Sequence, residues 1–242
     1  MENRLLEVHE IEQNWDLIQD RIEISAKKAG RNISDIKIIA VTKSHPPELI
    51  EKALKAGIRI FGENYAQEIR NKNEALSQYQ KKLIWHFIGH LQTNKIKYIT
   101  PFVDTIHSVD SSELAQEISH YAEKHERDIN ILLQINTSGE VQKSGCSPSE
   151  VFNLIEQITN LPNLKIKGLM TIGSFSNNEK IVRTEFNLLR STFEDVNNKF
   201  PELRLKELSM GMSGDYHWAV EDGATMLRIG TALFGHRLYS QD

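Results

Sequence analysis

The chain has 242 residues, 26% of them charged, and its formal net charge is −4. This length suits one large α/β barrel or two smaller domains, and the weak negative charge predicts no basic surface for nucleic acid or an anionic membrane. Cys146 is the only cysteine, which excludes an intramolecular disulfide and favours a reducing compartment. No apolar run has the length of a membrane span and the first residues do not resemble a signal peptide, so we expect a cytoplasmic protein.

The first predicted element is a long amphipathic helix. Apolar side chains recur at three- and four-residue spacing from Leu5 to Ala29, and Gly30 follows as a helix stop. This helix precedes the first strand and lies outside the alternating pattern that follows it.

Eight strand patterns follow, separated by seven helix patterns. The predicted strands cover residues 36–43, 58–61, 83–88, 103–109, 129–135, 166–172, 205–210 and 225–230. Strict alternation of strands and helices implies parallel strands, and eight such units close into a barrel of roughly 250 residues. We therefore predict an α/β fold, a single TIM-type (β/α)8 barrel over residues 1–242, with the extra N-terminal helix filling the gap left by a missing final helix. The alternative is a doubly wound sheet, which usually carries glycines after its first strand, and residues 43–47 contain none.

Two helix starts carry capping signals. Asp110 is followed by Glu113 three residues later, which predicts Asp110 as the N-cap of the helix that contains Leu114 and Ile118. Residues 147–150 read Ser-Pro-Ser-Glu, a capping box with proline at the first helical position. We expect this box to open the helix that buries residues 151–158.

Lys43 stands at the predicted carboxyl end of the first strand. In an α/β barrel this end of the strands forms the mouth, where ligands bind. A lysine amine that is partly desolvated there can lose its proton and attack a carbonyl group. The alternative is a lysine that only extends its charge from a strand end into water.

Two loops near the end of the chain contain small residues, hydroxyl groups and glycines. Residues 209–215 follow the seventh predicted strand and residues 230–235 follow the eighth, which are the two positions where barrels of this type usually bind phosphate. Backbone N–H groups at such turns bind a phosphate dianion well. Each loop alone could be an ordinary turn, but the two together predict a phosphate site.

Arg228 interrupts an apolar strand two residues before Gly230, on the same face as Met226 and Gly230. If that face is the barrel interior, a permanent cation is buried there and needs a partner, either a structural ion pair or a ligand atom. A lysine amine, a phosphate cradle and a buried arginine together describe a site for pyridoxal 5′-phosphate (PLP), with Lys43 holding the aldehyde as a Schiff base. Arginine does not keep the pyridine nitrogen protonated, which weakens the electron-sink chemistry of this cofactor.

Three more polar residues are weaker candidates. Asn64 follows the second strand on the predicted rim and is a plausible neighbour of the cofactor ring, although a turn-forming asparagine would look the same. His86 and His107 lie within strands, and their parity does not reveal whether they face the interior. No carboxylate stands at ligand spacing from them, so we expect no metal site.

Several motifs resemble those of the pyridoxal phosphate homeostasis proteins. They are residues 40–43, 61–65, 85–95, 143–145, 208–213 and 227–235. The resemblance implies a single barrel like the N-terminal domain of alanine racemase, with PLP on Lys43 and Arg228 facing the ring nitrogen. It also implies phosphate contacts from Ser213, Gly230 and Thr231, to which we add Ser209. Leu227 and His217 depart from the family pattern, and neither is a predicted contact.

The resemblance implies a PLP carrier without catalytic residues of its own. We expect a monomer, because the long first helix covers core and no further apolar stripe requires a partner subunit. Its role would be intracellular PLP (vitamin B6) and amino-acid homeostasis, with PLP-dependent apo-enzymes as possible recipients. A PLP-dependent amino-acid racemase is the main rival function, but racemisation needs bases on both faces of the substrate carbon. A Schiff-base aldolase that acts without a cofactor is a second rival function, and a pure interaction module is a third.

Overall fold

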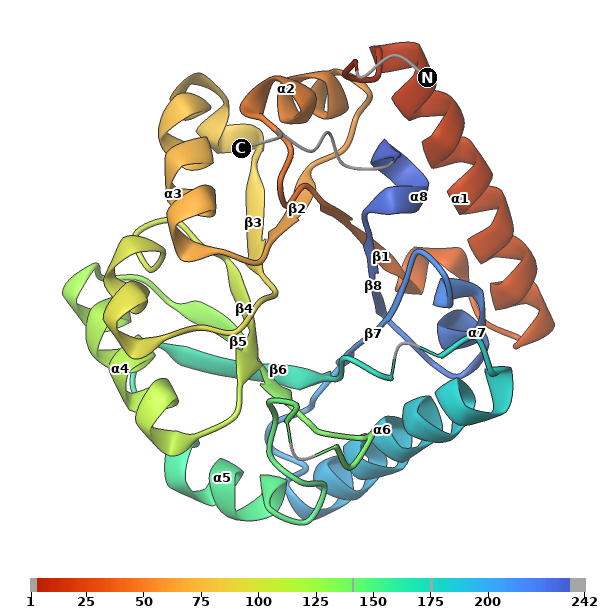
Figure 1. Cartoon of the computed structure of the whole chain (residues 1–242). Helices are drawn as coiled ribbons and strands as arrows, with labels where there is room; N and C mark the ends of the chain where they lie inside the picture. The colour runs from red at the N-terminus through yellow and green to blue at the C-terminus, as the bar shows by residue number, and fades with distance from the viewer. Residues whose placement is uncertain (1–3, 141, 175, 236–242) are drawn as a thin grey trace.

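The computed structural model describes residues 4–140, 142–174 and 176–235. Within this part of the chain, eight parallel strands pair in sequence order and close into a barrel through β1 and β8 (Figure 1). The strands are β1 (Lys37–Val41), β2 (Ile60–Glu63), β3 (Ile84–Phe87), β4 (Thr105–Val109), β5 (Ile129–Gln134), β6 (Leu164–Met170), β7 (Glu207–Met212) and β8 (Met226–Ile229). The predicted TIM-type barrel is confirmed, and its closure excludes an open doubly wound sheet.

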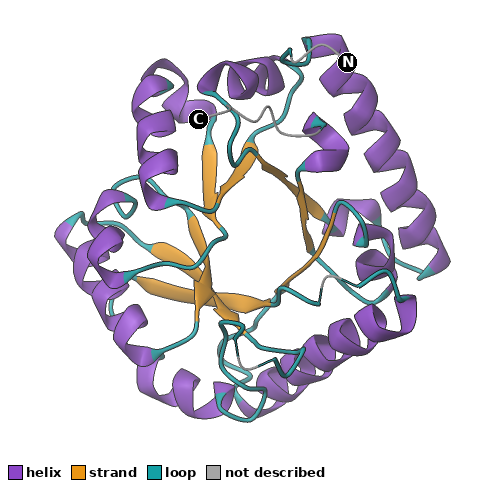
Figure 2. Ribbon diagram, in the orientation of Figure 1, coloured by secondary structure: helices purple, strands orange, loops and turns teal. Residues whose placement is uncertain are grey.

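Helices form a ring around the barrel (Figure 2). The α-helices are α1 (Val8–Lys28), α2 (Pro47–Lys55), α3 (Ala66–Ala75), α4 (Ser112–Lys124), α5 (Val151–Ile158), α6 (Glu179–Lys199), α7 (Tyr216–Glu221) and α8 (Thr231–Phe234). Three 3-10 helices, η1 (Ile33–Asp35), η2 (Ser77–Lys82) and η3 (Thr93–Tyr98), lie in the connections, and η3 alone joins β3 to β4. Across the described residues, no helix combines the length and the apolar character that crossing a membrane requires.

Helix α1 lies along the barrel beside α7 and α8 (Figure 1). Its buried stripe includes Ile11, Ile18 and Ile22, and Gly30 follows in a left-handed conformation with φ 67°. Asn14 Nδ2 donates a hydrogen bond to Leu233 O at 2.9 Å, which fixes α1 against α8. Because α8 has only four residues, α1 covers the wall that a longer final helix would cover, as predicted.

Several strands are displaced from their predicted ranges. The first predicted strand included Lys43, but β1 ends at Val41. Thr42 N still donates to Gly62 O at 3.1 Å, and the chain then turns through Ser44, whose φ is 64°. The second and seventh strands extend two residues beyond their predicted ends, to Glu63 and Met212. Runs of apolar residues in the sequence show which part of a strand is buried under helices. The ends of a strand are set instead by its backbone hydrogen bonds to the two neighbouring strands.

The two capping predictions had different outcomes. The N-cap of α4 is Ser111, whose Oγ accepts from Leu114 N at 3.3 Å, so the assignment to Asp110 is wrong. The Asp110 carboxylate instead accepts from Gly145 N at 3.2 Å, in the loop that follows the neighbouring strand β5. Before α5, the two reciprocal bonds of the predicted capping box are present: Ser147 N donates to Glu150 Oε2 at 2.8 Å and Glu150 N donates to Ser147 Oγ at 3.3 Å. The predicted helix start is wrong, because α5 begins at Val151 with Glu150 as its N-cap and Pro148 is not its first helical residue.

The apolar core has two layers. The large layer fills the space between strands and helices, with Phe61, Trp85 and Phe186 among its largest fully buried side chains. The small layer lies inside the barrel and is built around Ile39, Leu132, Met170 and Met226. The buried polar side chains include His107, Ser209 and Arg228, and the candidate site begins with them.

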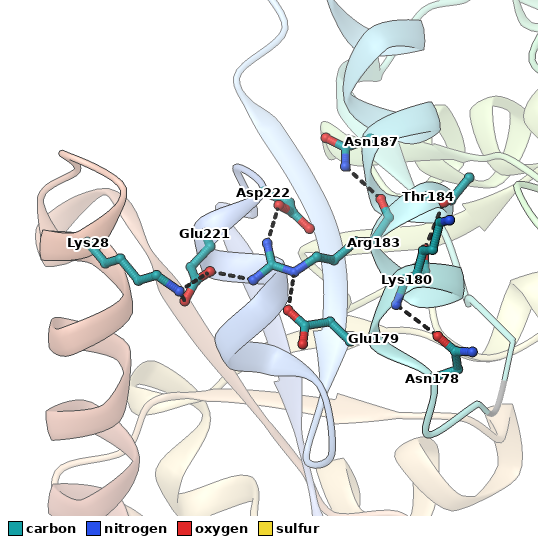
Figure 3. Close-up of polar contacts among 9 residues, drawn as sticks. All are labelled: Lys28, Asn178, Glu179, Lys180, Arg183, Thr184, Asn187, Glu221 and Asp222. Carbon is teal, nitrogen blue, oxygen red and sulfur yellow. Dashed lines mark hydrogen bonds and ion pairs between the residues drawn. The ribbon is translucent and has the colours of Figure 1, made fainter.

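A network of ion pairs joins α1, α6 and α7 on the outside of the barrel (Figure 3). Arg183 of α6 contacts Glu179 at 2.7 Å, Asp222 at 2.8 Å and Glu221. Lys28 of α1 reaches the same Glu221 at 2.8 Å. This network holds three helices around β7 and β8, the strands that lead into the two predicted phosphate loops.

Candidate functional site

A cavity of about 510 Å³ opens at the carboxyl ends of the strands. Six of the seven predicted site residues line it: Lys43, Asn64, Ser213, Arg228, Gly230 and Thr231. The seventh, Ser209, is fully buried below the cavity and touches Arg228. The fold therefore gathers all seven predicted residues at one end of the barrel, although they come from four different strand ends.

Lys43 is half-buried, two residues beyond the end of β1. Both of its neighbours in the chain are held by a buried lysine on α3 and its carboxylate partner. Lys72 Nζ donates to Thr42 O at 2.7 Å, and Glu68 Oε1 accepts from Ser44 N at 2.6 Å. Lys72 also contacts Glu68 at 2.7 Å. The backbone that carries Lys43 is therefore fixed on both sides.

Sequence reasoning missed this supporting group, which consists of Glu63, Glu68 and Lys72. A signal was available, because Lys72 lies on the face of α3 that also carries Ile69 and Leu76. A charged residue on an apolar helix face implies a buried partner. Glu63 is that partner, with Oε1 at 2.6 Å from Lys72 Nζ. Burial raises the pKa of Glu63 to about 7, opposed by the nearby Lys72.

The two predicted phosphate loops are joined by Ser213. Its Oγ accepts hydrogen bonds from Gly230 N at 3.2 Å and from Ala232 N at 3.1 Å. On the other side of the turn, Asp215 Oδ1 accepts from Met212 N at 2.5 Å. The Ser213 hydroxyl and backbone N–H groups of both loops thus lie at one corner of the cavity, where these three N–H groups are bonded within the protein.

Arg228 points into the barrel, as expected for the face it shares with Met226. The side chain is 4% exposed, and it donates to Ser209 Oγ at 2.6 Å and to Thr171 O at 2.8 Å. Burial lowers the pKa of Arg228 to about 10, opposed by Asp215. The guanidinium therefore remains charged at neutral pH while it lines the cavity.

His86 and His107 also face the interior, which the strand pattern left open. His86 Nδ1 lies 2.8 Å from His107 Nε2, and His107 Nδ1 lies 3.0 Å from Ser209 Oγ. Burial lowers the pKa of both imidazoles, that of His86 to about 3. In the described chain, no group of three or more His, Cys, Asp or Glu side chains has an arrangement that could hold a metal ion.

The amino-acid sequence is similar to those of known proteins. The family model for the alanine racemase N-terminal domain matches residues 9–238. The pyridoxal phosphate homeostasis protein of Vibrio alginolyticus is 39% identical over 232 residues, covering 95% of this chain and 99% of that protein. Its counterpart in Escherichia coli is 35% identical over 238 residues, covering 97% of this chain and 100% of that protein.

The fold is also similar to those of solved structures. PipY of Synechococcus elongatus with PLP bound superposes with a TM-score of 0.79 at 35% identity, covering 90% of this chain and 100% of that one. Alanine racemase of Clostridium difficile superposes with a TM-score of 0.72 at 17% identity, covering 95% of this chain and 58% of that enzyme. The likeness to the racemase shows a shared fold alone.

Proposed function

The chain belongs to the pyridoxal phosphate homeostasis protein family, and on that premise we propose that it holds PLP as a Schiff base on Lys43. In this proposal the protein binds and buffers the cofactor in intracellular vitamin B6 and amino-acid homeostasis, without strong catalytic activity of its own. The observation that carries the proposal is the convergence of Lys43, Arg228 and the two loops joined by Ser213 around one cavity. The relative PipY, whose structure holds PLP, supports it.

The chemistry of the cavity fits the cofactor. Its volume of about 510 Å³ lies within the usual range for small-ligand sites. Asn64 Oδ1, on the rim, is a buried acceptor without a hydrogen-bond partner among the described residues, so it is available to a ligand donor. Gly230, Thr231 and Ser213 would hold the phosphate, and Arg228, which rests on Ser209, would face the ring nitrogen.

When bound, PLP supplies an aldehyde that reacts with amines, and the residues around it decide what further chemistry is possible. Arg228 donates hydrogen bonds but does not protonate a ring nitrogen, because its guanidinium keeps its proton at neutral pH. Among the described residues that line the cavity, Asp215 is the only carboxylate, and its Oδ1 already accepts from Met212 N. This supports a carrier over a racemase, which needs a second base opposite Lys43.

The decisive experiment is a visible absorption spectrum of purified protein with added PLP, before and after borohydride. We expect a yellow band that borohydride removes, with the cofactor then fixed to the peptide that contains Lys43. Lys43→Ala should abolish both signals, whereas Lys55→Ala, which changes an exposed lysine on α2, should keep them. A wild-type protein that shows no band after PLP is added would overturn the proposal.

A second assay separates carrier from enzyme. The wild-type protein is incubated with PLP and single-enantiomer amino acids, and the product is resolved by chiral chromatography. We expect no racemisation above that of the Lys43→Ala protein. Racemisation that depends on Lys43 would replace the carrier with the rival racemase function.

We also propose that the protein works as a cytoplasmic monomer that passes PLP to apo-enzymes. The free Cys146 is half-buried, and burial raises the pKa of its thiol to about 12, so it fits a reducing compartment as an unreactive side chain. The apolar side chains Leu17 and Ile24 are exposed on α1, but single exposed side chains do not require a partner. Sedimentation of the purified protein with and without PLP tests the monomer.

A further inference from the structure

Four buried polar side chains form an unbroken row through the barrel interior. Arg228 of β8 donates to Ser209 Oγ of β7 at 2.6 Å, and Ser209 Oγ lies 3.0 Å from His107 Nδ1 of β4. His107 Nε2 then lies 2.8 Å from His86 Nδ1 of β3. Each of the four is at most 4% exposed. The row begins at the cavity and ends deep among the strands.

Each hydrogen bond in this row can be assigned a donor and an acceptor. A guanidinium has only donors, so Ser209 Oγ accepts from Arg228. Among the described residues, the one other hydrogen-bond partner of Ser209 Oγ is His107 Nδ1. If Nδ1 carried the proton, the hydroxyl hydrogen of the fully buried Ser209 would have no acceptor among the described residues, a costly arrangement. The hydroxyl therefore donates to Nδ1, which leaves the proton of neutral His107 on Nε2.

The same reasoning extends to His86. His107 Nε2–H donates to His86 Nδ1, so the proton of neutral His86 also stands on Nε2. The neutral state of both rings follows from what faces them. Arg228 and His86 act on His107, Lys37 acts on His86, and none of these groups is an anion. Burial lowers the pKa of both imidazoles, in agreement with this environment.

We propose that His107 and His86 are positioning residues for Arg228, held as neutral Nε2–H tautomers that order the Ser209 hydroxyl as its acceptor. Thr171 O holds the second terminal nitrogen of the guanidinium at 2.8 Å, so Ser209 and Thr171 together set its orientation in the cavity. A hydroxyl that donates onward is also a better acceptor, since hydrogen bonds in a chain polarise one another. The positioning of Arg228 toward a cofactor ring rests on the function proposed above. The assignment of the two histidine tautomers does not depend on that function.

The tautomers can be measured without any cofactor. In 15N-labelled protein free of PLP, we expect the nitrogen shifts of His86 and His107 to show the neutral Nε2–H form from pH 5 to pH 8. The single variants His86→Gln and His107→Gln assign the signals. An Nδ1–H tautomer, or titration of either buried ring in this pH range, would overturn the proposal.

The positioning role needs a second measurement. His107→Phe removes the acceptor of the Ser209 hydroxyl, and we expect PLP to bind up to about tenfold more weakly, as for the loss of one neutral buried hydrogen bond. The absorption maximum of the bound cofactor should also shift. His107→Gln keeps an acceptor and a donor, so it should recover most of the affinity and the wild-type maximum.

The outcomes separate the two proposals. If wild-type protein binds PLP but His107→Phe has the wild-type affinity and absorption maximum, the positioning role fails. If wild-type protein does not bind PLP, the proposed function fails. The nitrogen shifts still show which atom donates in each hydrogen bond of the row. Should His107→Phe not fold, the wild-type nitrogen shifts still decide, because the positioning role requires the Nε2–H tautomer of His107.

Discussion

Lys72 Nζ lies 2.6 Å from Glu63 Oε1 in the protein interior, where the two side chains are 4% and 0% exposed. The ammonium also donates to Thr42 O at 2.7 Å, and Glu63 Oε1 accepts from Thr42 Oγ1 at 2.6 Å. Thr42 precedes Lys43, so this buried pair supports the turn that presents the proposed cofactor lysine. Because both side chains are buried, a change to either one should alter the free energy of unfolding.

Replacing Lys72 with methionine should destabilise the protein strongly. The variant leaves the Glu63 carboxylate buried without its cation, which typically costs about 3–5 kcal/mol. Urea unfolding at pH 8 measures the change. Arg70→Met is the matched control on the same helix, because its pair with Glu74 is exposed and should contribute at most about 0.5 kcal/mol. Equal losses in the two variants would show that the buried pair has no special role.

The Glu63 carboxyl should make stability depend on pH. Burial raises its pKa in the folded protein to about 7 from an ordinary 4.5, opposed by Lys72. The folded state therefore keeps this proton to a higher pH than the unfolded chain. Its contribution to stability is present below pH 4.5 and is lost as the pH rises through about 7. We expect wild-type protein to lose on the order of 1–3 kcal/mol relative to Glu63→Gln between pH 5 and pH 8.

Unfolding free energies of the two proteins across this pH range check the effect, with the exposed Glu74→Gln as the control. The opposite trend, in which wild-type protein gains stability over Glu63→Gln as the pH rises, would mean that the carboxyl is ionised in the folded state throughout.

Gly89→Ala should disturb both the fold and the cavity rim. A Cβ at this position would lie 2.2 Å from Asn64 O, so the backbone of Asn64 must move, at a cost of about 1–3 kcal/mol. Gly230→Ala is the comparison, since its Cβ would meet nothing closer than Val41 O at 3.4 Å. Thermal unfolding of both variants measures the difference. A Gly89→Ala protein as stable as Gly230→Ala would show that the rim adapts freely.

Ser213→Ala should loosen the junction of the two loops. The substitution removes the acceptor of Gly230 N and Ala232 N, which should lower the free energy of unfolding by about 1 kcal/mol. If the loops bind phosphate, PLP affinity should fall as well, and inorganic phosphate should compete less well with PLP than in wild-type protein. Ser191→Ala, on the exposed face of α6, should change neither quantity. Unchanged affinity and competition would remove Ser213 from the proposed phosphate site.

The sequence by itself determined the barrel and the end of the barrel at which the candidate site lies. Strand and helix patterns are local, since a side-chain period of two or of 3.6 is visible within ten residues. Strict alternation then leaves few topologies, and the polar residues Lys43, Asn64 and Ser213 stand just after strands. Those positions sufficed to bring six of the seven predicted residues into one cavity.

Only the tertiary structure decided what each of these residues touches. The partners of Arg228 are 19 and 57 positions away in the chain, and the cap assigned to Asp110 belongs to Ser111 because the Asp110 carboxylate turns to Gly145. A period of two separates the two faces of a strand but does not say which face lies inside the barrel. The row of buried hydrogen bonds through His107 therefore could not be predicted from the sequence. Burial and long-range hydrogen bonds depend on residues that meet only after the barrel has closed, which is why they decide the chemistry and the local pattern decides the fold.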